Sequence, residues 1–141
     1  MTYTISVRVQ SDTRVQLVES SVWHYANGGT WNFSAAPDSF VLTMAGSGTS
    51  GMLRFQLPSG ELFAIAVGIH NYAPWSGVAV DIGPSDTLQV VHKEFYAGGP
   101  RSSPTLKDSV GNSKSGLSAG VLYNDTESND KSYKAVIAIV I

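Results

Sequence analysis

Apolar and polar residues alternate along much of the chain. Rows of this kind run over residues 3–9, 40–44, 52–57 and 63–69, and the last of them is the longest. A period of two places successive side chains on opposite faces of an extended strand, so each row predicts a half-buried strand. The segment 133–141 is apolar on both faces, which predicts a central strand.

Turn-forming residues separate these rows. Strands that recur between such turns indicate a β-sandwich or a barrel, and a helical period is nearly absent. Residues 84–87, PSDT, have the composition of a helix start. Residues 101–120 are rich in Ser, Gly and Lys, and we expect a loop with short elements. The turn signals are at residues 27–29, 37–38, 58–60, 83–84, 98–100 and 128–130.

Length and composition indicate one globular domain over residues 1–141. The chain has 43% hydrophobic and 14% charged residues, and it has no cysteine, which fits a reducing compartment. Its net charge of −2 and its nine scattered basic residues give no reason to expect nucleic acid as a partner. No apolar run reaches the length of a membrane span. The first residues lack the regions of a signal peptide, so we expect a cytosolic protein.

The stretch AGSGTSG at residues 45–51 contains G-x-G-x-x-G, the spacing that holds a dinucleotide pyrophosphate. In such a site the last glycine must begin a helix within a βαβ unit. Here the alternating row 52–57 follows, and the acid expected about 20 residues further on is missing. The motif therefore does not predict a nucleotide site.

Two interpretations of this stretch remain open. In the first, the glycines only turn a hairpin loop between two strands. In the second, a loop with small side chains and several hydroxyls binds a neutral, hydroxyl-rich ligand, meaning a sugar. The segments 23–31 and 69–75 carry aromatic residues, and Asn71 in the second of them can bond paired sugar hydroxyls. Trp23, Trp31, Tyr72 and Trp75 can equally be packing residues.

The sequence offers no constellation for catalysis, and we expect no metal and no cofactor. The three histidines, His24, His70 and His92, do not have the spacing of a zinc site. There is no cysteine nucleophile and no G-x-S-x-G elbow. The nearby acids Asp81 and Asp86 do not by themselves define a glycosidase pair.

Four segments together resemble the fungal fruit-body lectins, typified by the common-mushroom agglutinin. They are TYTISVRV at residues 2–9, HYANGGTW at 24–31, LTMAGSGTSGMLRF at 42–55 and VGIHNYAPW at 67–75. The resemblance implies a two-sheet antiparallel β-sandwich of the actinoporin type, found also in sea-anemone pore-forming toxins. It further implies a non-catalytic, multivalent agglutinin, a homotetramer that binds glycans and serves in defence.

The resemblance also implies a first sugar site that recognises N-acetylgalactosamine and the T-antigen disaccharide, galactosyl-N-acetylgalactosamine. We expect the Ser47 hydroxyl and the amides of Gly48 and Asn71 to converge on an axial sugar hydroxyl. Ala26 would leave room for the sugar, and His70 would support Asn71. By motif, the site comprises Ala26, Ser47, Gly48, His70 and Asn71.

A second site of the family binds N-acetylglucosamine through an acid, Ile, Thr, Arg and Tyr. Gly77 stands here for the acid and Val80 for the Thr, so most of the hydrogen-bonding capacity is lost. We expect this site to be weak, altered or absent. Its positions in this chain are Gly77, Val78, Val80, Arg101 and Asn112.

The alternative function is a membrane-active protein with the same sandwich. That function would call for an amphipathic N-terminal helix, whereas residues 1–9 alternate as a strand. Dye release from liposomes would distinguish it from a lectin.

Overall fold

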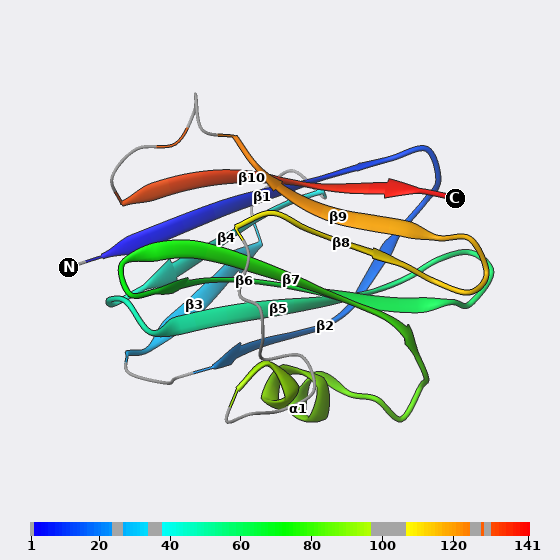
Figure 1. Ribbon diagram of the computed structural model, residues 1–141, viewed down its shortest axis with the longest axis horizontal. Helices are drawn as coiled ribbons and strands as arrows, with labels where there is room; N and C mark the ends of the chain where they lie inside the picture. Colours follow the sequence, from blue (N-terminus) through cyan, green and yellow to red (C-terminus); the bar gives the residue numbers. More distant parts are fainter. Residues whose placement is uncertain (1, 24–26, 34–37, 97–106, 125–127, 129–130) are drawn as a thin grey trace.

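The structure, a computed structural model, is built from two facing β-sheets (Figure 1). It describes residues 2–23, 27–33, 38–96, 107–124, 128 and 131–141. One sheet has the strand order β3-β4-β1-β10-β9-β8 and the other has the order β2-β5-β6-β7. The six strands of the first sheet are β1 (Tyr3–Ser11), β3 (Gly29–Phe33), β4 (Ser39–Met44), β8 (Ser109–Asn112), β9 (Ser118–Tyr123) and β10 (Ser132–Val140). The four strands of the second are β2 (Gln16–Trp23), β5 (Thr49–Gln56), β6 (Leu62–His70) and β7 (Ala73–Ile82).

This architecture confirms the predicted all-β, two-sheet sandwich. The described strands pair antiparallel except β1 and β10, which run parallel with Val7 opposite Ala135. The prediction of a central strand at the C-terminal end is confirmed, since β10 lies between β1 and β9. Its inner side chains are buried, but Val140 on the outer face is 58% exposed.

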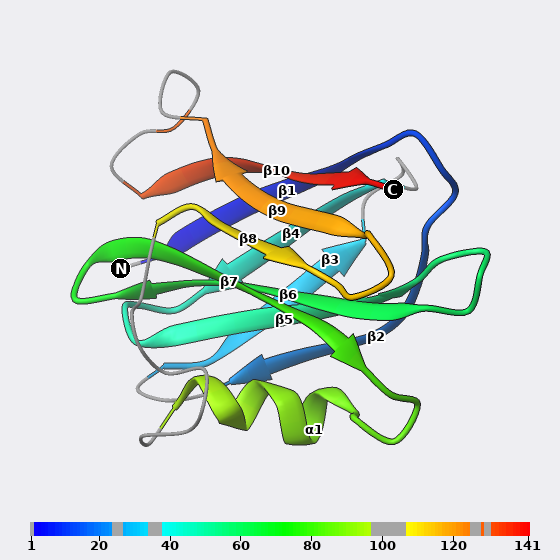
Figure 2. The same ribbon diagram turned by 45° about the vertical axis from the view of Figure 1, so that its right-hand side comes forward.

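The main core fills the space between the two sheets, and a second core lies on the outer face of the four-stranded sheet. There α1 (Leu88–Val91) and the 3-10 helix η1 (His92–Phe95) cover the sheet, and Figure 2 shows this helical segment beneath β2. Strands β5 and β6 are therefore buried on both faces. The prediction that residues 52–57 and 63–69 are half-buried strands is wrong on that point, because the sequence pattern does not show this second cover. The second core comprises Met52, Leu62, Ala64, Ala66, Trp75, Ala79, Ile82, Leu88 and Val91.

An ion pair anchors the helical segment where it begins. Arg54 on β5 is 8% exposed, and its Nη1 donates to Glu19 Oε1 at 3.1 Å. Its Nη2 donates to the Pro84 carbonyl oxygen at 3.0 Å, and the Leu88 amide donates to the same Glu19 oxygen at 2.9 Å. A buried charge is tolerated only when it is paired in this way. The helical turn expected at residues 84–87 lies further along the chain: residues 84–85 form a turn, and α1 begins at Leu88 with Thr87 as its N-cap.

A buried histidine anchors the segment where α1 passes into η1. His92 is 2% exposed, with Ser21 Oγ 2.8 Å from Nδ1 and Ser50 Oγ 2.8 Å from Nε2. Ser50 Oγ also hydrogen-bonds the Tyr96 hydroxyl, and Trp23 stacks on the Tyr96 ring at 4.8 Å. Burial lowers the pKa of His92 from its ordinary value of 6.5 to about 4. The imidazole is thus held neutral, with one nitrogen donating and the other accepting.

The stability of the fold is expected to fall in mild acid because of His92. Between pH 6.5 and pH 4 the unfolded chain binds a proton that the folded chain excludes, so stability is full above pH 6.5 and is lost toward pH 4. The loss is about 3 kcal/mol of unfolding free energy. Urea unfolding at pH 7 and pH 4 measures it.

The matched variants for this measurement are His92→Gln and His70→Gln, since His70 is exposed. The first should be less stable than the parent at pH 7 but should lose less stability on acidification. The variant His70→Gln should lose as much stability on acidification as the parent does. Equal pH dependence in the parent and His92→Gln would show that His92 is not the responsible group.

Candidate functional site

Three loops meet at one end of the sandwich, on the left in Figure 1. They are the β2–β3, β4–β5 and β6–β7 connections, and Ser47 of the second loop joins the other two. The Asn27 side-chain amide donates to the Ser47 carbonyl oxygen at 2.7 Å, and the Tyr72 amide donates to Ser47 Oγ at 3.0 Å. The Thr49 hydroxyl in turn donates to the Asn27 carbonyl oxygen at 2.6 Å. Hydrogen bonds thus fix the three loops relative to one another.

The glycines of the β4–β5 loop have structural uses unrelated to a nucleotide. A Cβ on Gly46 would lie 2.7 Å from Asn27 Nδ2, so a side chain there would displace that amide. Gly48 has φ of 83°, a left-handed conformation that favours glycine. A Cβ on Gly51 would lie 2.7 Å from the Trp31 ring, which crosses β5 at this point. The structure confirms that a strand, β5, rather than a helix follows this motif.

The polar groups predicted to bind a sugar lie together at this end. Asn71 is exposed at the β6–β7 turn with φ of 49°, and its Nδ2 is 3.3 Å from His70 Nε2. Ser47 lies beside the turn through its bond with Tyr72. The Gly48 amide, by contrast, donates to the Ile69 carbonyl oxygen at 2.8 Å. Our expectation that this amide is open to a ligand needs correction, because a sugar oxygen would have to share it.

Ala26, the remaining member of the predicted first site, lies outside the described residues. From the sequence, its neighbour Asn27 is predicted only to belong to a turn. In the structure the Asn27 side chain donates to the Ser47 carbonyl oxygen, and the Asn27 carbonyl oxygen accepts from the Thr49 hydroxyl, so Asn27 is bonded both to the β4–β5 loop and to the start of β5. The sequence does contain a signal for this role of Asn27. An asparagine followed by two glycines favours hydrogen bonds between its side chain and the backbone.

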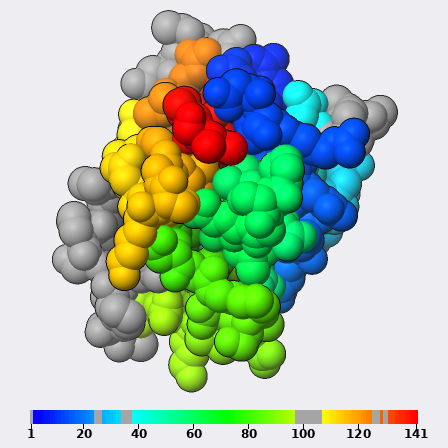
Figure 3. All heavy atoms as spheres, turned by 90° about the vertical axis from the view of Figure 1, so that its right-hand side faces the viewer, coloured from blue at the N-terminus to red at the C-terminus, as the bar shows by residue number. Residues whose placement is uncertain are grey.

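The described residues of these three loops carry no charged side chain. Their surface offers hydroxyl and amide groups, which suit a neutral, hydroxyl-rich ligand. Charged side chains, Glu61, Asp81 and Lys114, line instead a groove of about 470 Å³ at the opposite end of the sandwich. The β5–β6 and β8–β9 turns and the end of β7 lie there, on the face that Figure 3 turns toward the viewer. That groove is lined by Ser59, Gly60, Glu61, Leu62, Asp81, Ile82, Pro84, Lys114 and Ser115.

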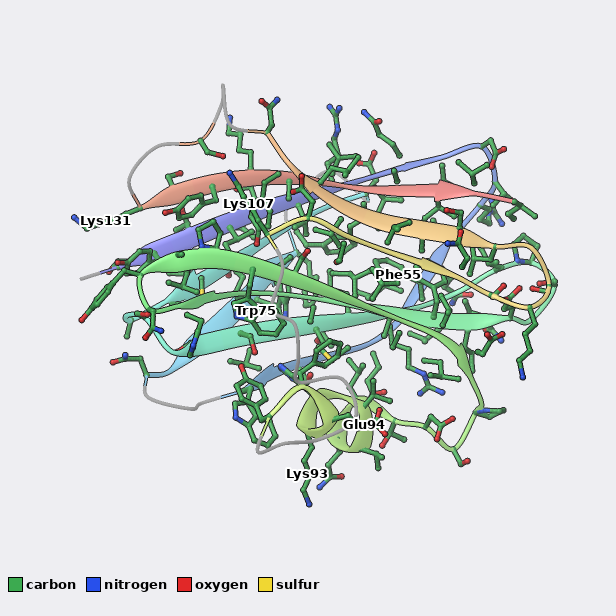
Figure 4. All side chains as sticks on the ribbon, viewed as in Figure 1. Phe55, Trp75, Lys93, Glu94, Lys107 and Lys131 are labelled. Carbon is green, nitrogen blue, oxygen red and sulfur yellow. The ribbon has the colours of Figure 1, made fainter. Side chains whose placement is uncertain are left out.

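The four aromatic residues left open by the sequence fall into two groups. Trp31 and Trp75 are buried, and Trp23 is half-buried against Tyr96, so these three are packing residues. Figure 4 shows Trp75 on β7, and its ring lies 5.8 Å from the Phe95 ring of the helical segment. Tyr72 differs, because it is 74% exposed at the tip of the β6–β7 turn.

The positions of the predicted second site do not form one polar surface. A Cβ on Gly77 would lie 2.2 Å from the Phe95 ring, so the space that an acid needs is filled. Val78 and Val80 point to the other face of β7, where they approach Gly111 of β8 and pack against the main core. Asn112 is exposed on β8, and Arg101 lies outside the described residues.

Two further observations concern metal binding and membrane-spanning helices. Within the described part of the chain, no three His, Asp or Glu side chains gather where they could hold a metal ion. None of its helices is long and apolar enough to cross a membrane. The described residues of the loop end therefore offer a ligand neutral hydrogen-bonding groups and one exposed aromatic ring, that of Tyr72.

A sandwich that presents neutral polar loops at its strand ends fits a carbohydrate-binding module. Residues 1–135 match the family model for fungal fruit body lectins. The chain belongs to this family of non-catalytic, carbohydrate-binding proteins.

Individual relatives agree with this assignment. The chain is 47% identical to Boletus edulis lectin over 106 residues, which are 72% of this chain and 73% of that protein. The crystal structure of wild-type Xerocomus chrysenteron lectin has a TM-score of 0.89 and 35% identity, covering 99% of this chain and 100% of that one. A triple mutant of that lectin gives a TM-score of 0.89 with 37% identity, covering 99% of each chain.

Substitution of Gly77 tests the description of the second site. Gly77→Ala should lower the unfolding free energy by about 1–3 kcal/mol, because the new methyl group overlaps the Phe95 ring. Gly83→Ala is the matched control, since a Cβ there would lie 3.6 Å from its nearest neighbour, Asp86. Urea unfolding of the two variants makes the comparison.

The variant Gly77→Asp restores the acid that the family resemblance calls for. It should gain no affinity for N-acetylglucosamine by calorimetry, because Phe95 occupies the space. Tight binding of that sugar by a stably folded Gly77→Asp would contradict this account.

Proposed function

We propose that this lectin binds N-acetylgalactosamine and the disaccharide galactosyl-N-acetylgalactosamine at the loop end of the sandwich. The site comprises Ala26, Ser47, Gly48, His70 and Asn71. The observation that carries the proposal is the hydrogen bond from the Tyr72 amide to Ser47 Oγ, which holds the Ser47 hydroxyl beside Asn71. The two side chains then face a ligand together, as the binding of neighbouring sugar hydroxyls requires.

The chemistry of these groups suits a sugar hydroxyl pair. A hydroxyl that accepts one hydrogen bond can still donate its own hydrogen, so Ser47 Oγ donates to a sugar oxygen. The Asn71 side-chain oxygen accepts from a sugar O–H. Asn71 Nδ2 lies 3.3 Å from His70 Nε2, and donation of this amide hydrogen to the ring nitrogen orients the Asn71 amide. An axial hydroxyl beside an equatorial one presents both groups on one edge of a galactose-type ring.

Asn71→Gly tests the site without adding strain, since glycine adopts the positive φ of this position at no cost. Loss of the amide should weaken binding of the free disaccharide about tenfold, the effect of losing one or two good hydrogen bonds. Isothermal titration calorimetry measures it.

The control is Asn32→Ala, an exposed asparagine on β3 outside the three loops. It should bind the disaccharide as the parent does. If Asn71→Gly also binds like the parent, the assignment of this site is wrong.

We further propose that the lectin is a homotetramer and an agglutinin serving in defence. A shallow site of neutral groups binds weakly, and multivalency raises the effective affinity for a cell surface. An apolar patch on the outer face of the six-stranded sheet supports self-association, because Leu122 is 50% and Val110 is 63% exposed. Val136 lies directly opposite Leu122, on β10. The patch comprises Val110, Leu122, Val136, Ala138 and Val140.

Leu122→Lys should break the assembly and abolish agglutination of red cells, while the affinity for free disaccharide stays unchanged. Val18→Lys is the control, since Val18 is a 41% exposed valine on β2 of the other sheet. Analytical ultracentrifugation reports the oligomeric state. A Leu122→Lys protein that sediments like the parent would show that this patch is not the interface.

The fold gives less support to the alternative function, membrane activity. Residues 3–11 form β1, which pairs with β4 on one side and β10 on the other. Release of this segment as a membrane-active helix would break both pairings and expose Ile5 and Val7 of the main core. We therefore place glycan binding first.

A further inference from the structure

The β6–β7 turn has an aromatic residue in a conformation that favours glycine. His70 and Ala73 close the hairpin, and both central residues have positive φ, 49° at Asn71 and 64° at Tyr72. Two-residue turns of this kind strongly prefer Asn-Gly. The asparagine is present, but tyrosine occupies the position where glycine would be unstrained. Strain of this kind persists where the surroundings impose it, and it clusters at ligand sites.

The packing of the protein does not account for this tyrosine. Tyr72 is 74% exposed, whereas Trp31 and Trp75 at the same end of the sandwich are 8% and 7% exposed. The contact that fixes Tyr72 is made by its main chain, through the bond from its amide to Ser47 Oγ. A glycine would make the same bond. The ring is therefore held in solvent beside the proposed sugar site with no structural need for it.

We propose that the Tyr72 ring is an aromatic subsite for the second sugar ring of a bound glycan. This inference rests on the proposed function, since Ser47 and Asn71 bind the first ring through its hydroxyl groups. Tyr72 follows Asn71 directly and its amide is bonded to Ser47 Oγ, so its exposed side chain is available to a ring adjoining the one that these two residues bind. The apolar C–H face of a hexose packs on an aromatic face, and the phenolic hydroxyl remains available to a sugar oxygen. The subsite thus favours disaccharides over the single sugar.

Tyr72→Gly separates a binding role from a structural one. The variant has the preferred Asn-Gly turn, so its melting temperature should be at least that of the parent. Its affinity for galactosyl-N-acetylgalactosamine should nevertheless fall roughly tenfold, the value of one aromatic contact. Its affinity for N-acetylgalactosamine alone should change little. Calorimetry with both sugars measures the ratio of the two affinities.

Three further variants define the contact. Tyr72→Phe and Tyr72→Trp keep an aromatic face and should keep most of the preference for the disaccharide. Tyr72→Asn tolerates positive φ and should lose that preference as Tyr72→Gly does, which provides a second variant if the first fails to fold.

The possible outcomes are distinct. If Tyr72→Gly binds the disaccharide as the parent does, or loses both sugars equally, the subsite is overturned and the proposed function stands. If the parent binds neither sugar, the proposed function itself fails, and the subsite with it.

Discussion

Both faces of the two central strands of the four-stranded sheet, β5 and β6, are covered, and this constraint decides where a ligand can bind. The six-stranded sheet covers one face, while α1 and η1 cover the other. Strand β6 is consequently buried along its whole length until His70. A ligand that approaches these two strands can meet only their ends and the adjoining loops. The candidate site is accordingly built from turns, with the sandwich as a rigid support.

The cover is held to the sheet by polar groups that are themselves buried. Arg54 and Glu19 fix the beginning of the helical segment, and His92 is held between the Ser21 and Ser50 hydroxyls. The His92 imidazole has a partner at both nitrogens, and the Arg54 guanidinium is bonded through Nη1 and Nη2, while its buried Nε has no partner among the described residues. At the loop end polar groups are also hydrogen-bonded to one another, but part of their bonding capacity remains at the surface. There Ser47 satisfies groups from two other loops, and the hydroxyls and amides beside it stay at the surface.

Much of the fold could be predicted from the sequence, because β1, β4, β5 and β6 show their alternation openly and the segment of β10 is apolar on both faces. The edge strands β2 and β7 could not be predicted in this way. Strand β2 is rich in Ser, Gln and Glu, and β7 contains Pro74 and Gly77, so neither shows a clear apolar row. The double burial of β5 was hidden for a related reason. Arg54 looks like a solvent-facing residue until Glu19, 35 positions away, is seen beside it.

The candidate site shows the same limit. The family resemblance selected Ser47 and Asn71, and the structure places their loops together. The sequence could not separate Tyr72 from Trp31 and Trp75, because exposure depends on contacts with distant strands. Nor could it show that Phe95 fills the space beside Gly77, or that the Gly48 amide is bonded to Ile69.

The central claim is that glycans bind at the loop end, on groups positioned by Ser47. A crystal structure of the protein soaked with galactosyl-N-acetylgalactosamine tests it most directly. We predict one sugar ring within hydrogen-bonding distance of Ser47 Oγ and the Asn71 side chain. A disaccharide bound instead in the groove lined by Glu61, Asp81 and Lys114, with the loop end empty, would contradict the account.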